Sequence, residues 1–132
     1  MAHENEALIR RMYDAFARGD MPGVLACCTE DALFAVPGSN RVAGEYRGHQ
    51  GFLTGFLPAI AAVADLSTFS ESVDGLVCDE EKGIILTTQR FRRHDGTDVE
   101  FRSAVLFRFH DGLMSEFREH PGDPDQYDRA WK

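Results

Sequence analysis

Cysteines are scarce in this sequence, long apolar runs are missing, and basic residues are outnumbered by acidic ones. There are three cysteines, and two of them, Cys27 and Cys28, are neighbours. An odd count with adjacent members makes a poor disulfide framework, so we expect a reducing, cytoplasmic location. We interpret Cys27 and Cys28 as small core side chains, with a redox or metal role as the alternative.

No stretch of the chain approaches the roughly 18 apolar residues that a membrane-spanning helix needs. The first residues, Met1 to Glu6, lack the basic start and apolar run that a secretory signal shows. Acidic residues number 22 against 14 Lys and Arg, which gives a net charge of −8. Binding to nucleic acid or to an anionic membrane relies on basic surface, so we expect neither partner.

The common cofactor and metal motifs are also missing. We find no glycine-rich dinucleotide fingerprint, no P-loop, no His-Glu-x-x-His pair and no G-x-S-x-G elbow. No two histidines have the spacing of metal ligands on one face of an element. The sequence therefore predicts a protein without a cofactor or a metal site.

The composition is that of one globular domain. The 132 residues are 43% apolar and 27% charged, and a chain of this length buries about two thirds of its surface on folding. We expect residues 1–132 to form a single domain. Residues 121–132 are expected to be an extended C-terminal arm, which Trp131 can anchor.

Apolar residues in the first half of the chain have helical spacing. Residues 4–18 predict a helix that ends at Gly19, and Asp20 can cap a short second helix. A short strand over 32–36 and a polar loop over 39–47 follow. Residues 49–64 predict a third helix, and its buried stripe is Phe52, Phe56, Ile60 and Val63.

The second half changes to the period of two that strands show. Residues 67–78 predict one strand, or two strands broken near Asp74. Further strands are predicted over 83–94, 97–110 and 113–120, because Asp95-Gly96 and Asp111-Gly112 are hairpin turns. The layout is α+β: a strongly curved antiparallel (mixed) sheet with three helices on its concave side. The cone between them is a ligand pocket if side chains leave it open.

Several short motifs, in this order, carry a resemblance to a known family. They are YDAFARGD at 13–20, AVPG at 35–38, AGEYRG at 43–48, FRFHDG at 107–112 and EHPGDP at 119–124. With them the chain resembles the SnoaL-like branch of the NTF2-like superfamily, which is related to ketosteroid isomerase. The resemblance spans nearly the whole chain and implies the NTF2-like cone. Fold alone does not give a reaction, because this superfamily mixes several enzyme classes with domains that have no catalysis.

The residues that carry ketosteroid isomerase chemistry are not kept. By this resemblance the catalytic tyrosine falls on Met12, the general base on Val36 and the protonated aspartate on Val105. Valine cannot abstract a proton, and methionine cannot donate one to an oxyanion. Tyr13 lies one residue from the tyrosine position, about 100° around the helix.

The same resemblance indicates which side chains face into the cone. The expected lining is mostly apolar with a few polar groups, which suits a small hydrophobic or aromatic molecule. A shift of one residue along a strand would exchange its two faces. The expected substrate-binding residues are Met12, Phe34, Val36, Phe56, Leu86, Thr88, Phe101, Ser103, Val105, Phe107 and Phe117.

Glu119 is the candidate acid/base group, and Arg90 is its candidate partner or an oxyanion binder. Burial raises the pKa of a carboxyl group, whereas a nearby arginine lowers it. The alternative is a structural Glu–Arg ion pair near the end of the sheet. Tyr13 is a third candidate catalytic residue, or else a core residue with its hydroxyl bonded to backbone.

Three functions follow from these residues. The first is an enzyme that isomerises, cyclises or hydrates a small apolar molecule by acid–base chemistry. The second is a ligand-binding module without catalysis, which the loss of the isomerase positions favours. The third is a dimerising interaction domain. The outer sheet face is expected to carry Ile85, Thr87, Phe91, Ala104 and Leu106, and the resemblance implies a homodimer packed through it.

Overall fold

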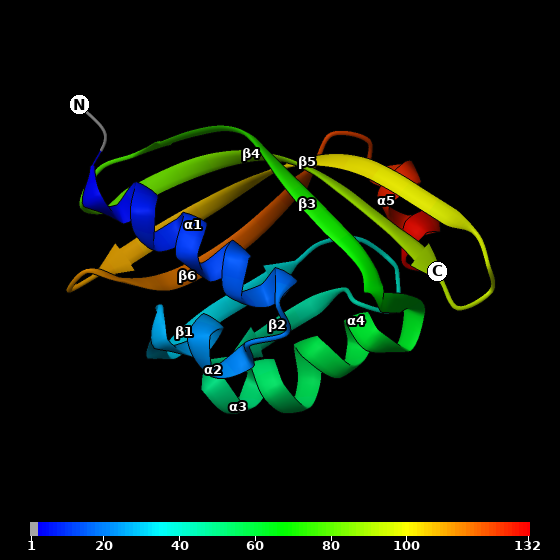
Figure 1. The fold of residues 1–132 in the computed structure, drawn as a ribbon, viewed down its shortest axis with the longest axis horizontal. Helices are drawn as coiled ribbons and strands as arrows, with labels where there is room; N and C mark the ends of the chain where they lie inside the picture. The colour runs from blue at the N-terminus through cyan, green and yellow to red at the C-terminus, as the bar shows by residue number, and fades with distance from the viewer. Residues whose placement is uncertain (1–2) are drawn as a thin grey trace.

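The computed structural model describes residues 3–132 as a six-stranded sheet with helices packed across it (Figure 1). The strand order is β2-β1-β6-β5-β4-β3. The β1–β6 pair is parallel, and the other neighbouring pairs are antiparallel. The predicted α+β class with a curved mixed sheet is confirmed. The strands are β1 Cys28–Val36, β2 Gly44–Arg47, β3 Ala64–Cys78, β4 Lys82–Arg93, β5 Asp98–His110 and β6 Leu113–Pro121.

The first two helices form where the sequence predicts them. Helix α1, Glu4–Ala17, ends just before Gly19, whose φ of +73° suits glycine. Helix α2, Met21–Ala26, begins after Asp20, whose side chain accepts the N–H of Gly23 at 2.9 Å. Helix α1 crosses the sheet and contacts β3 and β6, so it forms one wall of the cone (Figure 1).

The third predicted helix is one helical run with a wider turn inside it. Helix α3, Gly48–Gly51, continues into the π-helical turn η1, Phe52–Phe56, and then into α4, Leu57–Val63. Pro58 stands at the start of α4 and has no N–H to give to the preceding turn. The predicted stripe is confirmed: Phe52, Phe56, Ile60 and Val63 are all buried.

Two segments expected to be irregular belong to the sheet. β1 begins at Cys28, which pairs with Met114 of β6, so the segment 29–31 before the predicted strand lies within β1, in an irregularity of the pairing between Cys28 and Leu33. The predicted loop over 39–47 ends in β2, which pairs with β1 and sets Tyr46 opposite Phe34. Tyr46 then stacks on Phe56, with ring centroids 5.1 Å apart. Both segments become part of the sheet because of strand contacts with residues distant in the sequence.

The C-terminal segment is not an extended arm. Residues Pro124–Ala130 form helix α5, because Asp123 caps the N–H of Gln126 at 3.2 Å and Pro124 suits the first helical turn. The expected anchor does hold: Trp131 is 3% exposed and stacks on Phe91 with centroids 4.7 Å apart. The segment therefore closes one end of the cone.

The two faces of β4 are the reverse of those predicted. Ile85, Thr87, Gln89 and Phe91 are buried on the inner face, while Leu86 and its outer neighbours point away from the cone. The cause is the pairing with β5, in which Thr87 lies opposite the inward Ser103. Residues directly opposite in a ladder share a face. Residues 84–86 are all apolar, so alternation alone leaves this register open.

The outer face of the sheet keeps an apolar patch, although its members differ from those predicted. Ile85, Thr87 and Phe91 are not part of it, because all three are buried inside. Three exposed side chains stand there instead: Val77 at 71%, Ile84 at 46% and Leu86 at 51%. The predicted Ala104 and Leu106 lie beside them, opposite Leu86 and Ile84.

No helix among residues 3–132 is long and apolar enough to cross a membrane.

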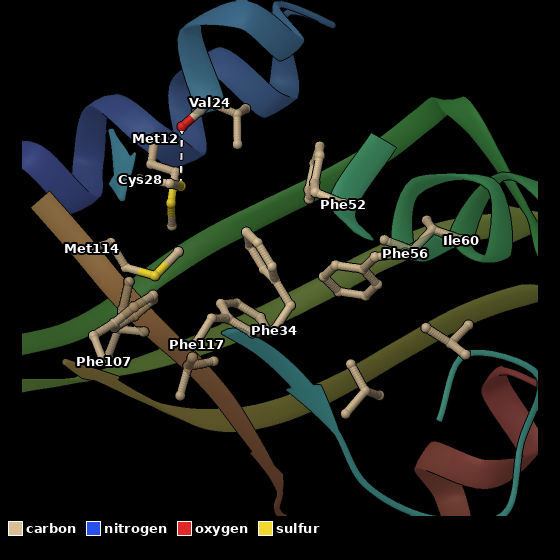
Figure 2. Close-up of a cluster of buried hydrophobic side chains, with 14 of the residues drawn as sticks. Met12, Val24, Cys28, Phe34, Phe52, Phe56, Ile60, Phe107, Met114 and Phe117 are labelled. Atoms are coloured by element: carbon tan, nitrogen blue, oxygen red, sulfur yellow. Dashed lines mark hydrogen bonds between the residues drawn. The ribbon is translucent and has the colours of Figure 1, made fainter. Parts of the chain in front are cut away.

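The core between the sheet and the helices is largely aromatic. Figure 2 shows Phe34 of β1 reaching between Phe117 of β6 and Phe56 of η1. The ring centroids lie 6.0 Å from Phe117 and 5.6 Å from Phe56. Behind them, the fully buried Phe107 makes an edge contact with Phe117. These rings fix the walls of the space described next.

Candidate functional site

A cavity lies inside the cone, bounded by α1, α2, η1, α4, α5 and the inner faces of four strands. It offers about 70 Å³ of space to the centre of a water molecule and is partly open to solvent. A cavity needs only about 10–15 Å³ of this reachable space to hold one water. The lining is apolar apart from the indole N–H of Trp131 and one group of side chains: Tyr13, Glu71, Gln89, Glu119 and Tyr127.

Glu119 lies at the centre of this polar group and is 4% exposed. Its Oε2 accepts the hydroxyl of Tyr127 at 2.5 Å, and its Oε1 accepts Nε2 of Gln89 at 3.2 Å. The same Nε2 of Gln89 donates to Oε2 of Glu71 at 3.0 Å. One amide group thus joins two carboxyl groups across the cavity.

Sheet register and the C-terminal helix bring these residues together. Glu71 of β3 lies directly opposite Gln89 of β4, and Glu119 of β6 lies opposite Val105 of β5. Tyr127 comes from α5, eight residues after Glu119. The site therefore rests on three strands of one sheet and on the helix that closes it.

Burial raises the pKa of both carboxyl groups. The pKa of Glu71 rises from 4.5 to about 8, first because of burial and then because of the neighbouring charge of Glu119. Glu71 is half-buried as a whole residue and lines both the cavity and the groove between α1 and β3, and its carboxyl group accepts from Gln89. Burial also raises the pKa of Glu119, while the hydrogen bonds from Tyr127 and Gln89 oppose this shift.

The two buried acids therefore affect each other's ionisation. Like charges in an apolar site do not both ionise readily, so the pair titrates as a unit. The hydrogen bonds that Glu119 accepts from Tyr127 and Gln89 favour its charged form and oppose the effect of burial on its pKa. Glu71, with a pKa of about 8, is the member that holds the proton. The site thus offers an acceptor and an acid side by side.

Tyr13 adds an uncommitted hydroxyl to the cavity. Its oxygen is buried and has no hydrogen-bond partner. Burial, followed by the charges of Glu71 and Glu119, raises its pKa well above 10, so it stays protonated. A buried hydroxyl without a partner costs stability, and a bound molecule would satisfy it. The alternative of a backbone-bonded Tyr13 is not seen.

The predicted site residues fall into three groups. Met12, Phe34, Phe56 and Phe117 line the cavity, together with Tyr13 and Glu119. Val36, Phe101, Ser103, Val105 and Phe107 are buried but lie outside the cavity lining. Leu86, Thr88 and Arg90 are on the other face of β4, where the hydroxyl of Thr88 bonds to Asp74 at 2.6 Å.

Arg90 is not the partner of Glu119. Its Nε lies 2.6 Å from Oε1 of Glu100, in an exposed pair across the β4–β5 hairpin. The one-residue change of face on β4 brings Gln89 to Glu119 in its place. The predicted Glu–Arg pair is therefore wrong, and the carboxylate of Glu119 is held by uncharged donors.

Glu71, Gln89 and Tyr127 were missed by reasoning from the sequence. A signal for Glu71 exists, because Phe69, Glu71 and Val73 alternate along one face of β3 with an acid between two apolar residues. Placing Gln89 in the site requires the correct register of β4. Tyr127 needed α5, which is set by the cap at Asp123 rather than by apolar periodicity.

The cysteines lie apart from the site. Cys27 and Cys28 are both buried in the hydrophobic core, as expected for small core side chains. Burial raises the pKa of the Cys28 thiol to about 12, so it stays protonated. Among residues 3–132, no group of three or more His, Cys, Asp or Glu side chains is arranged to hold a metal ion.

We expect the free energy of unfolding to fall as the pH rises from about 5 to about 8. The folded pKa of Glu71 is about 8 against 4.5 for the free side chain, so the folded protein binds this proton more tightly. That contribution is complete below about pH 4.5 and is lost as the pH rises through 8. Urea unfolding at several pH values measures it. Glu71→Gln should flatten the slope and Glu100→Gln, on the surface, should not. An unchanged slope in Glu71→Gln contradicts the buried pair.

Sequence comparison now assigns the family. The SnoaL-like domain model matches residues 9–117, so this chain belongs to the SnoaL-like family. An uncharacterized protein of Mycobacterium tuberculosis is 27% identical over 124 residues, which cover 94% of this chain and 93% of that protein. The resemblance read from the sequence is confirmed.

Solved structures agree on the fold. Bal32a, from a soil-derived mobile gene cassette, matches with a TM-score of 0.88 and 26% identity over 99% of this chain and 98% of its own. An NTF2-like protein of unknown function from Burkholderia pseudomallei has a TM-score of 0.87 and 23% identity, covering 98% of each chain. A putative polyketide cyclase from Pseudomonas putida has a TM-score of 0.73 and 17% identity, covering 100% and 99%. The last two matches show the fold alone.

Proposed function

We propose that this protein binds a small hydrophobic or aromatic molecule in the cone and moves a proton on it without a cofactor. The reaction class is isomerisation, cyclisation or hydration. One observation carries the proposal: Glu119 and Glu71, joined through Gln89, lie in an aromatic cavity beside the free hydroxyl of Tyr13. Enzymes of proton transfer pair a tuned base with a nearby donor in this way.

Each polar residue has a distinct place in such a reaction. Glu119 is the base, because each of its oxygens still has a lone pair after accepting one hydrogen bond. Tyr127 and Gln89 are positioning residues that hold its carboxylate. Tyr13 and the protonated Glu71 can donate to an oxygen on which negative charge develops. In this proposal the two carboxyl groups come from β3 and β6, whereas the tyrosine, Tyr13, comes from the same helix as Met12.

The family supports a small-molecule site, and one neighbour suggests a reaction. The putative polyketide cyclase from Pseudomonas putida shares the fold at 17% identity. A cyclisation of the aldol type begins with removal of a proton next to a carbonyl group, which a buried carboxylate can perform. The support is for the reaction class and does not extend to a named substrate.

Nitrobenzisoxazole is a direct probe of this function. It is a flat, uncharged aromatic, and a base opens it by removing its ring C–H proton. The C–H electrons form a nitrile, the N–O bond breaks, and a coloured cyanophenolate leaves. We expect the protein to open this compound faster than free acetate does. Binding without turnover would favour the ligand-binding module without catalysis. The absence of both binding and turnover would contradict the proposal.

We also propose a homodimer packed through the outer sheet face, where Val77, Ile84 and Leu86 are exposed. A stable interface buries about 1,200–2,000 Å² in total. Covering an exposed apolar patch removes it from water, which stabilises such a dimer. Light scattering should give about twice the mass of 14.8 kDa. Leu86→Lys should shift the protein to monomer, whereas Leu53→Lys, an exposed leucine on η1, should not. A monomeric natural protein at micromolar concentration contradicts this.

A further inference from the structure

The charges inside the cavity indicate which molecules it accepts. Two carboxyl groups line it, those of Glu71 and Glu119, and its lining residues within 3–132 include no Lys, Arg or His. The nearest groove outside, between α1 and β3, contains Arg10, which pairs with Glu6 at 3.6 Å. No basic group acts on the pKa of either buried acid. The buried charge is therefore without a counter-ion from the protein.

An anionic ligand has no favourable place in this cavity. Its charge would lie beside Glu119 in a site of low polarity, where repulsion between like charges is strong. The net charge of −8 also opposes its approach. The ligand is thus uncharged or positively charged.

The aromatic walls of the cavity favour a positively charged ligand. Phe34, Phe56 and Phe117 present rings to the cavity, and aromatic faces attract a cation within about 6 Å of their centres. An ammonium group carries three N–H donors and no acceptor. The site offers three acceptors for them: the carboxyl oxygens of Glu119 and Glu71, and the hydroxyl oxygen of Tyr13, which has no other partner.

We propose that the cavity selects a small hydrophobic amine, whose ammonium group lies among Glu119, Glu71 and Tyr13 and whose apolar body packs on the phenylalanine walls. The inference rests on the ligand cavity of the proposed function. It does not depend on the proton transfer. The ammonium group supplies the counter-ion that the cavity lacks, and it gives the oxygen of Tyr13 a hydrogen-bond donor at the same time.

Binding of an amine should be linked to release of a proton. At neutral pH Glu71 is protonated, because its pKa is about 8. A positive charge beside it favours the ionised form, so the carboxyl proton leaves to the solvent as the ammonium binds. A simple alkylamine stays protonated in this range, as lysine does with a pKa of about 10.4. Affinity should therefore rise as the pH increases from about 6 to about 8.

Isothermal titration calorimetry with benzylamine, benzyl alcohol and benzoate tests this. The three probes share one ring and differ in the charge of one group. We expect benzylamine to bind about tenfold or more tightly than benzyl alcohol, and benzoate not to bind. In two buffers of different ionisation heat, benzylamine alone should show proton release. Glu71→Gln should abolish that release, while Glu100→Gln should behave as the natural protein.

The outcomes separate this inference from the proposed function. Equal binding of benzyl alcohol and benzylamine, or tighter binding of benzoate, overturns the amine and leaves the ligand cavity in place. Amine binding that survives unchanged in Glu71→Gln also overturns it. Failure of all three probes to bind overturns both the amine and the cavity as a ligand site.

Discussion

Replacing Glu119 with glutamine should lower the rate of nitrobenzisoxazole opening about a hundredfold or more. A positioned general base contributes roughly 10²–10⁴-fold to a reaction of this kind. Glutamine keeps the size of the side chain and can still accept the hydrogen bond of Tyr127, but it cannot take the proton. Initial rates from the absorbance of the phenolate product give the effect.

Two controls make this result specific. Glu100→Gln is the same change on an exposed glutamate that pairs with Arg90, and it should leave the rate within about twofold. Circular dichroism and thermal unfolding show whether Glu119→Gln keeps the fold. A rate that is unchanged in a folded Glu119→Gln protein rules out Glu119 as the base.

Phe91→Ala should destabilise the protein by about 3–5 kcal/mol, while Arg90→Ala, its neighbour in the chain, should cost under about 1 kcal/mol. Phe91 is buried and stacks on both Trp131 and Phe69. Its loss leaves a cavity beneath the C-terminal helix. Arg90 makes only an exposed ion pair with Glu100. Urea unfolding gives both values.

This pair of variants tests the register of β4. The faces expected from the sequence alone place Arg90 inside and Phe91 outside, which predicts the opposite order of effects. Equal or reversed costs would contradict the structure. Arg90→Ala should also leave nitrobenzisoxazole turnover unchanged, because Arg90 does not reach Glu119.

Much of the fold could be predicted because local signals and packing agree. Helix α1 has a single apolar stripe and a glycine at its end, and β5 alternates strictly from Phe101 to Phe109. The two Asp-Gly turns set the hairpins on either side of β5. The family resemblance placed Phe117 and Glu119 inside the cone, and both do line the cavity.

The errors fall where the local pattern does not decide. Ile84, Ile85 and Leu86 are apolar on both faces of β4, so only the pairing with β5 fixes which of them is buried. A one-residue change there moved Arg90 out of the site and Gln89 into it. Helix α5 begins at a capping residue and a proline in a short acidic segment, and this helix places Tyr127 in the site. Two of the partners of Glu119 were thus beyond the reach of periodicity.

A structure of the crystallised protein soaked with benzyl alcohol would test the central claim most directly. The claim is that the cone binds a small aromatic molecule against Glu119. We predict the ring between Phe34, Phe56 and Phe117, with the hydroxyl of the ligand in hydrogen-bond contact with Glu119 or Tyr13. A cavity closed by its own side chains, with the compound absent or bound only at the surface, would contradict the account.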